Sequence, residues 1–213
     1  MERTPSIDLM HFIEQEILPQ YTQFDKAHQI SHVNSVIRNS IRIANEIGAE
    51  IDMCYTIAAY HDLGLTGQRA IHHLLGGKIL ANDARLKKWF SSHQIKIMKE
   101  AIEDHRASAS RTPRSIYGKI VAEADRDLKP ENVIRRTIQF SLAKEFSAPK
   151  EEHFQRFVKH MEEKYSRNGY LKVWIPKSDN EKNLKELQKI IENPERLRNL
   201  FDKIFSEEIV VLD

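Results

Sequence analysis

The sequence predicts an all-α protein, and three observations lead to that prediction. Apolar residues recur at intervals of three and four along most of the 213-residue chain, which is the pattern of amphipathic helices. Only seven glycines and seven prolines are present, so breaks between helical segments are few. A single stretch, residues 168–180, is predicted to be extended, which is too little for a sheet-based domain. The expected fold is therefore a helical bundle with a helical C-terminal extension.

The first helices are predicted from their caps. A helix starts near residue 6, with Ser6 or Asp8 as its N-cap. The next runs from residue 32 to Gly48, and glycine is a natural C-terminal stop. Asp52 is expected to cap the third helix, which ends at the His61–Asp62 doublet.

Further helices are predicted in the middle of the chain. Residues 69–82 are assigned to a helix despite two glycines that cost about 1 kcal/mol each. Residues 93–105 are strongly periodic and place His105 on their apolar face. After a polar loop, residues 114–128 resume helical spacing, and Pro130 suits the first turn of another helix.

The last third of the chain is charged and mostly helical. Residues 149–166 form an amphipathic helix, residues 168–180 are a short strand pair or a loop, and two helices follow. We therefore expect a domain over residues 1–148 and a helical extension over residues 149–213 packed on the same core.

Composition narrows the class of protein. The formal net charge of +2 is too small to indicate a nucleic-acid or membrane partner, and no apolar stretch approaches the roughly 20 residues that span a bilayer. The N-terminus lacks the charged region and apolar run of a signal peptide. Cys54 is the single cysteine and cannot form an internal disulfide, which fits a reducing compartment. A cytoplasmic location is expected.

Residues 55–67, YTIAAYHDLGLTG, place two ionisable side chains at the end of a buried helix. Burying His61 and Asp62 costs on the order of several kcal/mol unless they are paired, hydrogen-bonded or bound to a metal. Gly64 follows at once and is expected to let the chain turn away. Seven of the ten histidines lie between residues 28 and 105, so the chemistry is expected in this half.

Helical packing can bring four of these side chains together inside the bundle: His32, His61, Asp62 and Asp125. Imidazole suits Zn, Fe, Mn, Ni and Cu, and carboxylate suits Mg, Mn and Fe. A mixed set therefore indicates a transition metal, or a pair of ions that share a carboxylate.

Each candidate also has a structural interpretation. His32 could lie on a helix surface, and the doublet could be a dipole-stabilised histidine beside a solvated aspartate. Asp125 could pair with Arg126, and His105 could be a satisfied core histidine. A helical interaction protein with structural histidines is therefore an open alternative.

The order His32, His61–Asp62, Asp125 resembles the HD superfamily of metal-dependent phosphohydrolases, an all-helical family defined by His, His-Asp and Asp. DKAHQISHVNSVI (25–37) is similar to the family's first motif, AAYHDLG (58–64) to its second and ADR (124–126) to its last. The resemblance covers roughly residues 20–140. It implies that these four residues bind the metal, with His28 at the rim of the site.

A finer resemblance involves two more histidines. Some HD branches carry them to support a second ion, and HHLLGGKIL (72–80) and KEAIEDH (99–105) align His72 and His105 with them, leaving His73 out of phase. The stretch from His105 to Pro130 resembles HD-type hydrolases of diadenosine tetraphosphate. The doubled histidine and Gly-Tyr-Pro signature of HD-GYP phosphodiesterases are missing, as are the acidic residues usual in alarmone hydrolases. Hydrolysis of dinucleoside polyphosphates is thus favoured. A simple nucleotide phosphatase and a pyrophosphohydrolase are open alternatives.

The resemblance implies a hydrolase that cleaves phosphoester or phosphoanhydride bonds of a nucleotide-type substrate by attack of metal-bound hydroxide. The expected cofactor is one or two divalent ions of Fe, Mn, Zn, Ni or Mg, and Asp62 would bridge a pair. Asp62 and His28 are assigned catalytic roles, with His28 in substrate contact or proton transfer. The alternative function is a catalytically silent HD-fold module that binds nucleotides or acts as a scaffold.

Basic residues near the ligand helices are expected to bind phosphate, although each could also be solvated surface. They are Lys78, Arg69, Arg106, Arg111 and Arg114. The expected partner is a phosphorylated small molecule, with no nucleic acid and no membrane, and a homodimer is left open. Substrate choice is assigned to the loops 106–114 and 169–180.

Overall fold

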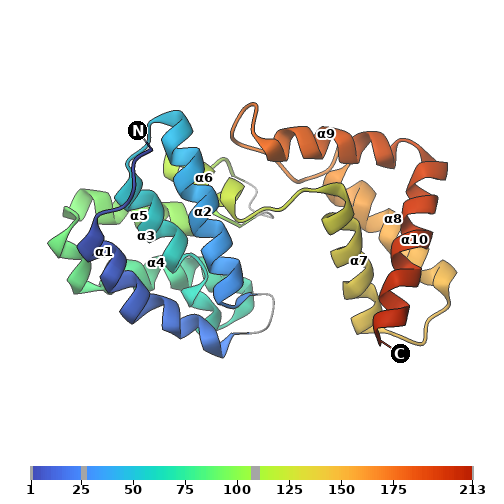
Figure 1. Cartoon of the computed structure of the whole chain (residues 1–213), viewed down its shortest axis with the longest axis horizontal. Coiled ribbons are helices and arrows are strands. Elements are labelled where there is room, and N and C mark those ends of the chain that lie inside the picture. Colours follow the sequence, from blue (N-terminus) through green and yellow to red (C-terminus); the bar gives the residue numbers. More distant parts are fainter. Residues whose placement is uncertain (1, 25–27, 107–110, 213) are drawn as a thin grey trace. The chain divides into compact units, whose positions relative to one another are not determined.

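The computed structural model describes residues 2–24, 28–106 and 111–212, which form helices joined by short connections (Figure 1). No strand occurs within these ranges, so the all-α prediction is confirmed. The chain divides into two compact units, Met1–Arg126 and Asp127–Asp213. Within the described ranges, none of the helices has the length and apolar character needed to cross a membrane.

The first unit contains the doublet. Its α-helices are α1 (Ile7–Phe12), α2 (Ile30–Ile47), α3 (Ile51–Tyr60), α4 (His72–Asn82), α5 (Ser92–Asp104) and α6 (Ile116–Ala124). Single turns of tighter or wider helix connect them: η1 (Ile13–Ile17), η2 (Leu18–Gln23), η4 (Leu63–Thr66), η5 (Arg69–Ile71) and η6 (Ala84–Lys88).

Helix α3 is the centre of this unit. Every residue of α3 except Asp52 is buried, as expected of a helix that is apolar on all sides. It packs against α2, α5 and α6, and α4 packs on α5. Helix α3 therefore delivers the residues that follow it into the interior, where His61 and Asp62 are both buried.

The observed helix caps match the predicted caps only in part. Gly48 ends α2 in the left-handed conformation at φ 77°, as predicted. The prediction that Asp52 caps α3 is wrong, because the Glu50 side chain accepts the N–H groups of Asp52 and Met53. Asp52 instead accepts the Ser6 backbone N–H and hydroxyl at 2.8 and 2.9 Å, and Ser6 makes no side-chain cap to α1.

Gly64 brings two backbone segments together. A Cβ atom at this position would lie 1.9 Å from the carbonyl oxygen of His72 and 2.5 Å from the amide nitrogen of Gly76. The contact of η4 with α4 thus requires a glycine at this position, and the φ of Gly64 is not in the left-handed region. This contact sets the position of the first turn of α4.

The second unit consists of α7 (Pro130–Lys144), α8 (Lys150–Tyr165), α9 (Asp179–Ile191) and α10 (Pro194–Leu212). Pro130 begins α7, as predicted. The stretch 168–180 is a loop that leads into α9, so the loop alternative is confirmed. Helix α7 belongs to this unit, whereas its residues fall in the domain predicted over residues 1–148. The predicted division into residues 1–148 and 149–213 stays a prediction.

Candidate metal centre

Six side chains from five helices converge in the first unit. His32 lies in the first turn of α2, and the doublet directly follows α3. His72 begins α4, while His105 and Asp125 lie immediately after the last residues of α5 and α6. Five of these positions are helix ends or starts, so they are fixed by the packing of whole helices.

One set of ligand atoms surrounds Oδ2 of Asp62. The Nε2 atoms of His32 and His61 lie 3.5 and 3.2 Å from this oxygen and 3.3 Å from each other. Oδ1 of Asp125 is 3.2 Å from His32 Nε2 and 3.7 Å from His61 Nε2. The four residues predicted from the sequence are therefore brought together.

A second set surrounds the other oxygen of the same carboxylate. Oδ1 of Asp62 is 3.6 Å from Nε2 of His72 and 3.7 Å from Nε2 of His105. The two imidazole nitrogens are 3.2 Å apart. Each set has the geometry of a three-ligand group able to hold an ion, and Asp62 belongs to both.

Three of the histidines are held with Nε2 facing inward. The Nδ1 atom lies 2.7 Å from the carbonyl oxygen of Ala58 in His61, 2.8 Å from that of Arg69 in His72, and 2.6 Å from that of Ile102 in His105. A carbonyl oxygen only accepts, so Nδ1 must donate, and Nε2 of each neutral ring carries a lone pair. Such second contacts are typical of metal-ligating histidines.

The buried histidines and carboxylates of the centre shift one another's pKa values. Burial lowers the pKa of His105 to about 4, with His61 adding to the effect, so its Nε2 is unprotonated at neutral pH. Burial alone would also lower the pKa of His32, but the carboxylates of Asp125 and Asp62 outweigh it and raise that pKa to about 10. Burial would raise the pKa of Asp62, yet His61 and His32 hold it well below its usual range.

The donor set fits a divalent metal. Ligand atoms held about 2.1 Å from one ion lie roughly 3.0–3.4 Å from each other, close to the spacings within both sets. In the second set, two imidazole lone pairs face each other at 3.2 Å, and a cation between them would satisfy both. Histidine nitrogen and carboxylate oxygen together suit Fe, Mn, Ni and Zn.

Tyr21 takes part in this centre although the sequence analysis did not select it. Its buried hydroxyl donates to the Ala59 carbonyl at 3.0 Å and accepts the backbone N–H of Asp62 at 3.4 Å. It thus satisfies backbone groups at the end of α3. The sequence feature that could have identified Tyr21 as a buried residue is its spacing of four residues from Ile17, within an apolar series that starts at Leu9.

The rim of the centre carries His28 and Arg69. His28 is half-buried, and its ring lies 5.8 Å from that of His32. An Arg69 guanidinium nitrogen lies 3.4 Å from His28 Nε2. The structure therefore brings these two predicted residues together beside the ligands.

Arg111 and Arg114 are engaged elsewhere. Both guanidinium groups bind the buried carboxylate of Asp104, at 2.9 Å for Arg111 and 3.0 Å for Arg114. The Arg114 backbone N–H also donates to Asp104, at 2.8 Å. These contacts hold Arg111 and Arg114 against the end of α5, and the phosphate-binding role of the two arginines stays a prediction.

The other predicted phosphate ligands lie in different places. Arg106 donates to the carbonyl of Ala70 at 2.8 Å, while Lys78 is exposed on α4 and lines a groove described below. His73 is half-buried and lies outside both ligand sets, as its phase predicted. Part of the loop 106–114 assigned to substrate choice, residues 107–110, lies outside the described residues.

Comparison with known proteins gives one family and one structure. A family model described as HD domain matches residues 30–128. A solved structure described as a predicted HD superfamily hydrolase from an uncultured Thermotogales bacterium is 21% identical, with a TM-score of 0.48. The match covers 98% of this chain and 95% of that chain. None of the curated proteins matches.

Proposed function

Since residues 30–128 match the HD domain family model, we propose that the chain is a metal-dependent phosphohydrolase that acts on a nucleotide-type substrate. The observation that supports this most strongly is the division of the Asp62 carboxylate between two sets of inward-facing histidines. A structural histidine cluster would not need three rings held by carbonyl oxygens at Nδ1, two of them with Nε2 lone pairs that face each other at 3.2 Å.

In this proposal His32, His61, Asp62 and Asp125 hold one ion, and Asp62, His72 and His105 hold a second. A bound divalent ion lowers the pKa of a coordinated water and polarises a phosphoryl oxygen. The chain contributes the orientation of the ligands through the carbonyls of Ala58, Arg69 and Ile102. The metal is one of Fe, Mn, Zn, Ni or Mg.

We assign substrate contact and proton transfer to the rim. His28 lies beside the first ligand set, and because the Arg69 guanidinium can only donate to its Nε2, Nδ1 is the ring nitrogen that can give a proton to a leaving oxygen. The neighbouring Arg69 is a cation with a planar fork that suits a phosphate group. Dinucleoside polyphosphates are the substrates we favour, in a cytoplasmic enzyme.

The test is one substitution read out in two ways. Asp62→Ala removes a ligand from both sets, so the purified variant should lose bound metal and lose hydrolysis across a panel of nucleotides and dinucleoside polyphosphates. Asp179→Ala, which removes an exposed carboxylate in the second unit, is the matched control and should change neither. Circular dichroism establishes that both variants are folded. If Asp62→Ala retains full metal content and activity, the assignment is wrong.

The alternative function, an HD-fold module that binds nucleotides without catalysis, would give a different experimental result. A protein that only senses nucleotides would bind them tightly without turnover in every divalent metal tried. Six ligand side chains in place favour turnover, because a sensor has no need of a complete set for two ions.

A further inference from the structure

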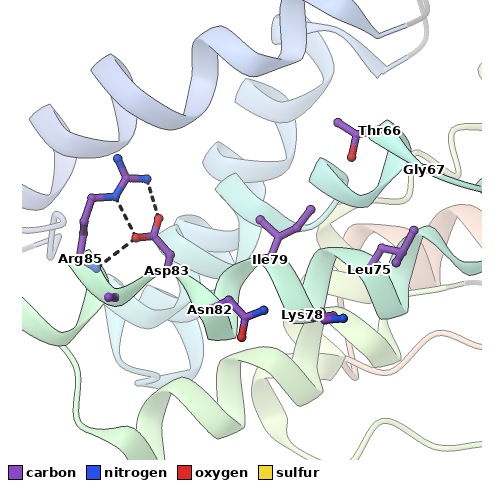
Figure 2. Close-up of a pocket in the computed structure, with 9 residues that line it drawn as sticks. Thr66, Gly67, Leu75, Lys78, Ile79, Asn82, Asp83 and Arg85 are labelled. Atoms are coloured by element: carbon purple, nitrogen blue, oxygen red, sulfur yellow. Dashed lines mark hydrogen bonds and ion pairs between the residues drawn. The ribbon is translucent and has the colours of Figure 1, made fainter.

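A groove runs along one side of α4, and none of the six convergent side chains is among the residues that line it. Its volume is about 810 Å³, within the range of small-molecule sites. Figure 2 shows Asp83 and Arg85 at one end and Thr66 and Gly67 at the other. We propose that this groove is a second ligand site, which binds a small organic anion with an apolar body.

The apolar part of the groove comes from one face of α4. Leu75 and Ile79 are one helical turn apart, and Lys78 and Asn82 follow the same spacing beside them. Leu75 and Ile79 are each half-buried, so they offer an apolar surface at the base of an open cavity. Such a surface suits the ring or chain of an organic molecule better than a bare ion.

The carboxylate of Asp83, at one end of the groove, already has hydrogen-bond and ion-pair partners. Asp83 accepts the Tyr60 hydroxyl at 2.8 Å and two Arg85 guanidinium nitrogens at 2.8 and 2.7 Å. Burial would raise the pKa of Asp83, but Arg85 and Tyr60 hold it below its usual value. Arg85 also contacts a carboxylate oxygen of Glu16 at 3.2 Å, so its guanidinium group already has two acidic partners and this end of the groove carries no net positive charge.

Lys78 supplies the remaining charge. It is exposed, and no carboxylate within the described ranges pairs with its ammonium group. The Asn82 amide lies one turn further on and can hydrogen-bond a polar edge of the ligand. A phosphate or carboxylate head on Lys78, with its body on Leu75 and Ile79, therefore matches the groove.

This site does not depend on the proposed metal chemistry. The lining residues include none of the metal-ligand candidates, so binding should persist when the metal centre is destroyed. The groove is nonetheless linked to the segments on both sides of the doublet, because Tyr60, which precedes His61, donates to the lining residue Asp83, and the lining residue Thr66 ends the turn after Asp62. A loss of hydrolysis and a loss of groove binding can thus be told apart.

The experiment measures binding in EDTA with the Asp62→Ala chain, which removes any competing metal site. Isothermal titration calorimetry is run with adenosine 5′-monophosphate, phenyl phosphate and inorganic phosphate as probes. Lys78→Glu should weaken binding of the two organic phosphates by about tenfold or more. Lys96→Glu, the same charge change on an exposed residue of α5, should leave the affinity within about twofold.

Three results would overturn the proposal. No saturable binding of either organic phosphate up to about 5 mM would remove the site. Equal affinity of Lys78→Glu and its parent would show that Lys78 does not bind the anion. Inorganic phosphate that binds as tightly as phenyl phosphate would show that the apolar surface does not contribute to binding. Amide chemical shift changes confined to residues 66–67 and 75–85 would support it directly.

Discussion

Gly64→Ala adds one methyl group where two backbones meet, and we expect it to damage both stability and metal binding. The new Cβ would meet three backbone atoms, at 1.9 Å from His72 O, 2.8 Å from His72 C and 2.5 Å from Gly76 N. Backbone atoms cannot rotate aside as a side chain can. Ordinary contact begins near 3.4 Å, so η4 and α4 must separate by roughly 1.5 Å.

The expected cost follows from that displacement. Overpacking of a core typically costs about 1–3 kcal/mol, and this contact belongs at the upper end because rigid segments must move. A loss of about 3 kcal/mol should lower the unfolding midpoint of the first unit by roughly 10 °C. His72 moves with α4, and a shift of 1.5 Å far exceeds the tolerance of about 0.2 Å on a metal–ligand distance.

The assay combines thermal unfolding, followed by circular dichroism, with metal content per chain. We expect Gly64→Ala to lose the ion held by Asp62, His72 and His105 while retaining the other, whose ligands lie on or next to α2, α3 and α6. Gly67→Ala is the matched control, because the one close contact of its Cβ would be with the Leu75 Cδ1 atom, at 2.6 Å, and that side chain can rotate, whereas the backbone oxygen of Gly64 is at an ordinary 3.7 Å. Wild-type stability and metal content in Gly64→Ala would refute the reasoning.

Three further predictions concern single groups. Metal binding at about pH 7.5 should release a proton from His32, because the Asp125 and Asp62 carboxylates outweigh burial and raise its pKa to about 10; affinity should therefore rise with pH up to that value. Tyr21→Phe should lower stability by about 1–2 kcal/mol and weaken metal binding, since it leaves buried backbone groups at the end of α3 without a partner. Cys54 should resist thiol reagents at about pH 8 until the protein unfolds, because burial raises its pKa to about 12.

Each of these has a direct check. Calorimetry in buffers of different ionisation heat counts the released protons, and a heat independent of the buffer would contradict the assignment of His32. Urea unfolding and a metal titration test Tyr21→Phe against Tyr170→Phe, an exposed tyrosine of the second unit. Rapid labelling of the native protein would show that Cys54 is accessible.

Much of the centre could be predicted because its ligands are tied to helix ends. The apolar series of α3 stops at the doublet, and a histidine and an aspartate placed there are buried by the packing of the helix itself. Apolar residues at intervals of three and four, with few glycines and prolines, indicated helices throughout. The order of the ligands along the chain was enough to relate helices that are far apart in sequence.

The errors arise where tertiary contacts choose between similar residues. Glu50 and Asp52 are both acidic and both near the start of α3; Ser6 binds Asp52, and Glu50 makes the cap. The contact of Arg111 and Arg114 with Asp104 was not predicted, because the burial of Asp104 is not visible in the sequence; their phosphate-binding role stays a prediction. The local sequence pattern does not show which distant side chain binds a given residue in the folded protein.

The hydroxyl of Tyr21 shows that sequence similarity and folding have different boundaries in this chain. The family match begins at residue 30, yet Leu9, Ile13, Ile17 and Tyr21 are almost completely buried. A chain shortened to start at Ile30 would expose the apolar side of the first unit and leave the Ala59 carbonyl without its donor. Such a fragment would contain every proposed metal ligand and still lack part of what holds Asp62 in place.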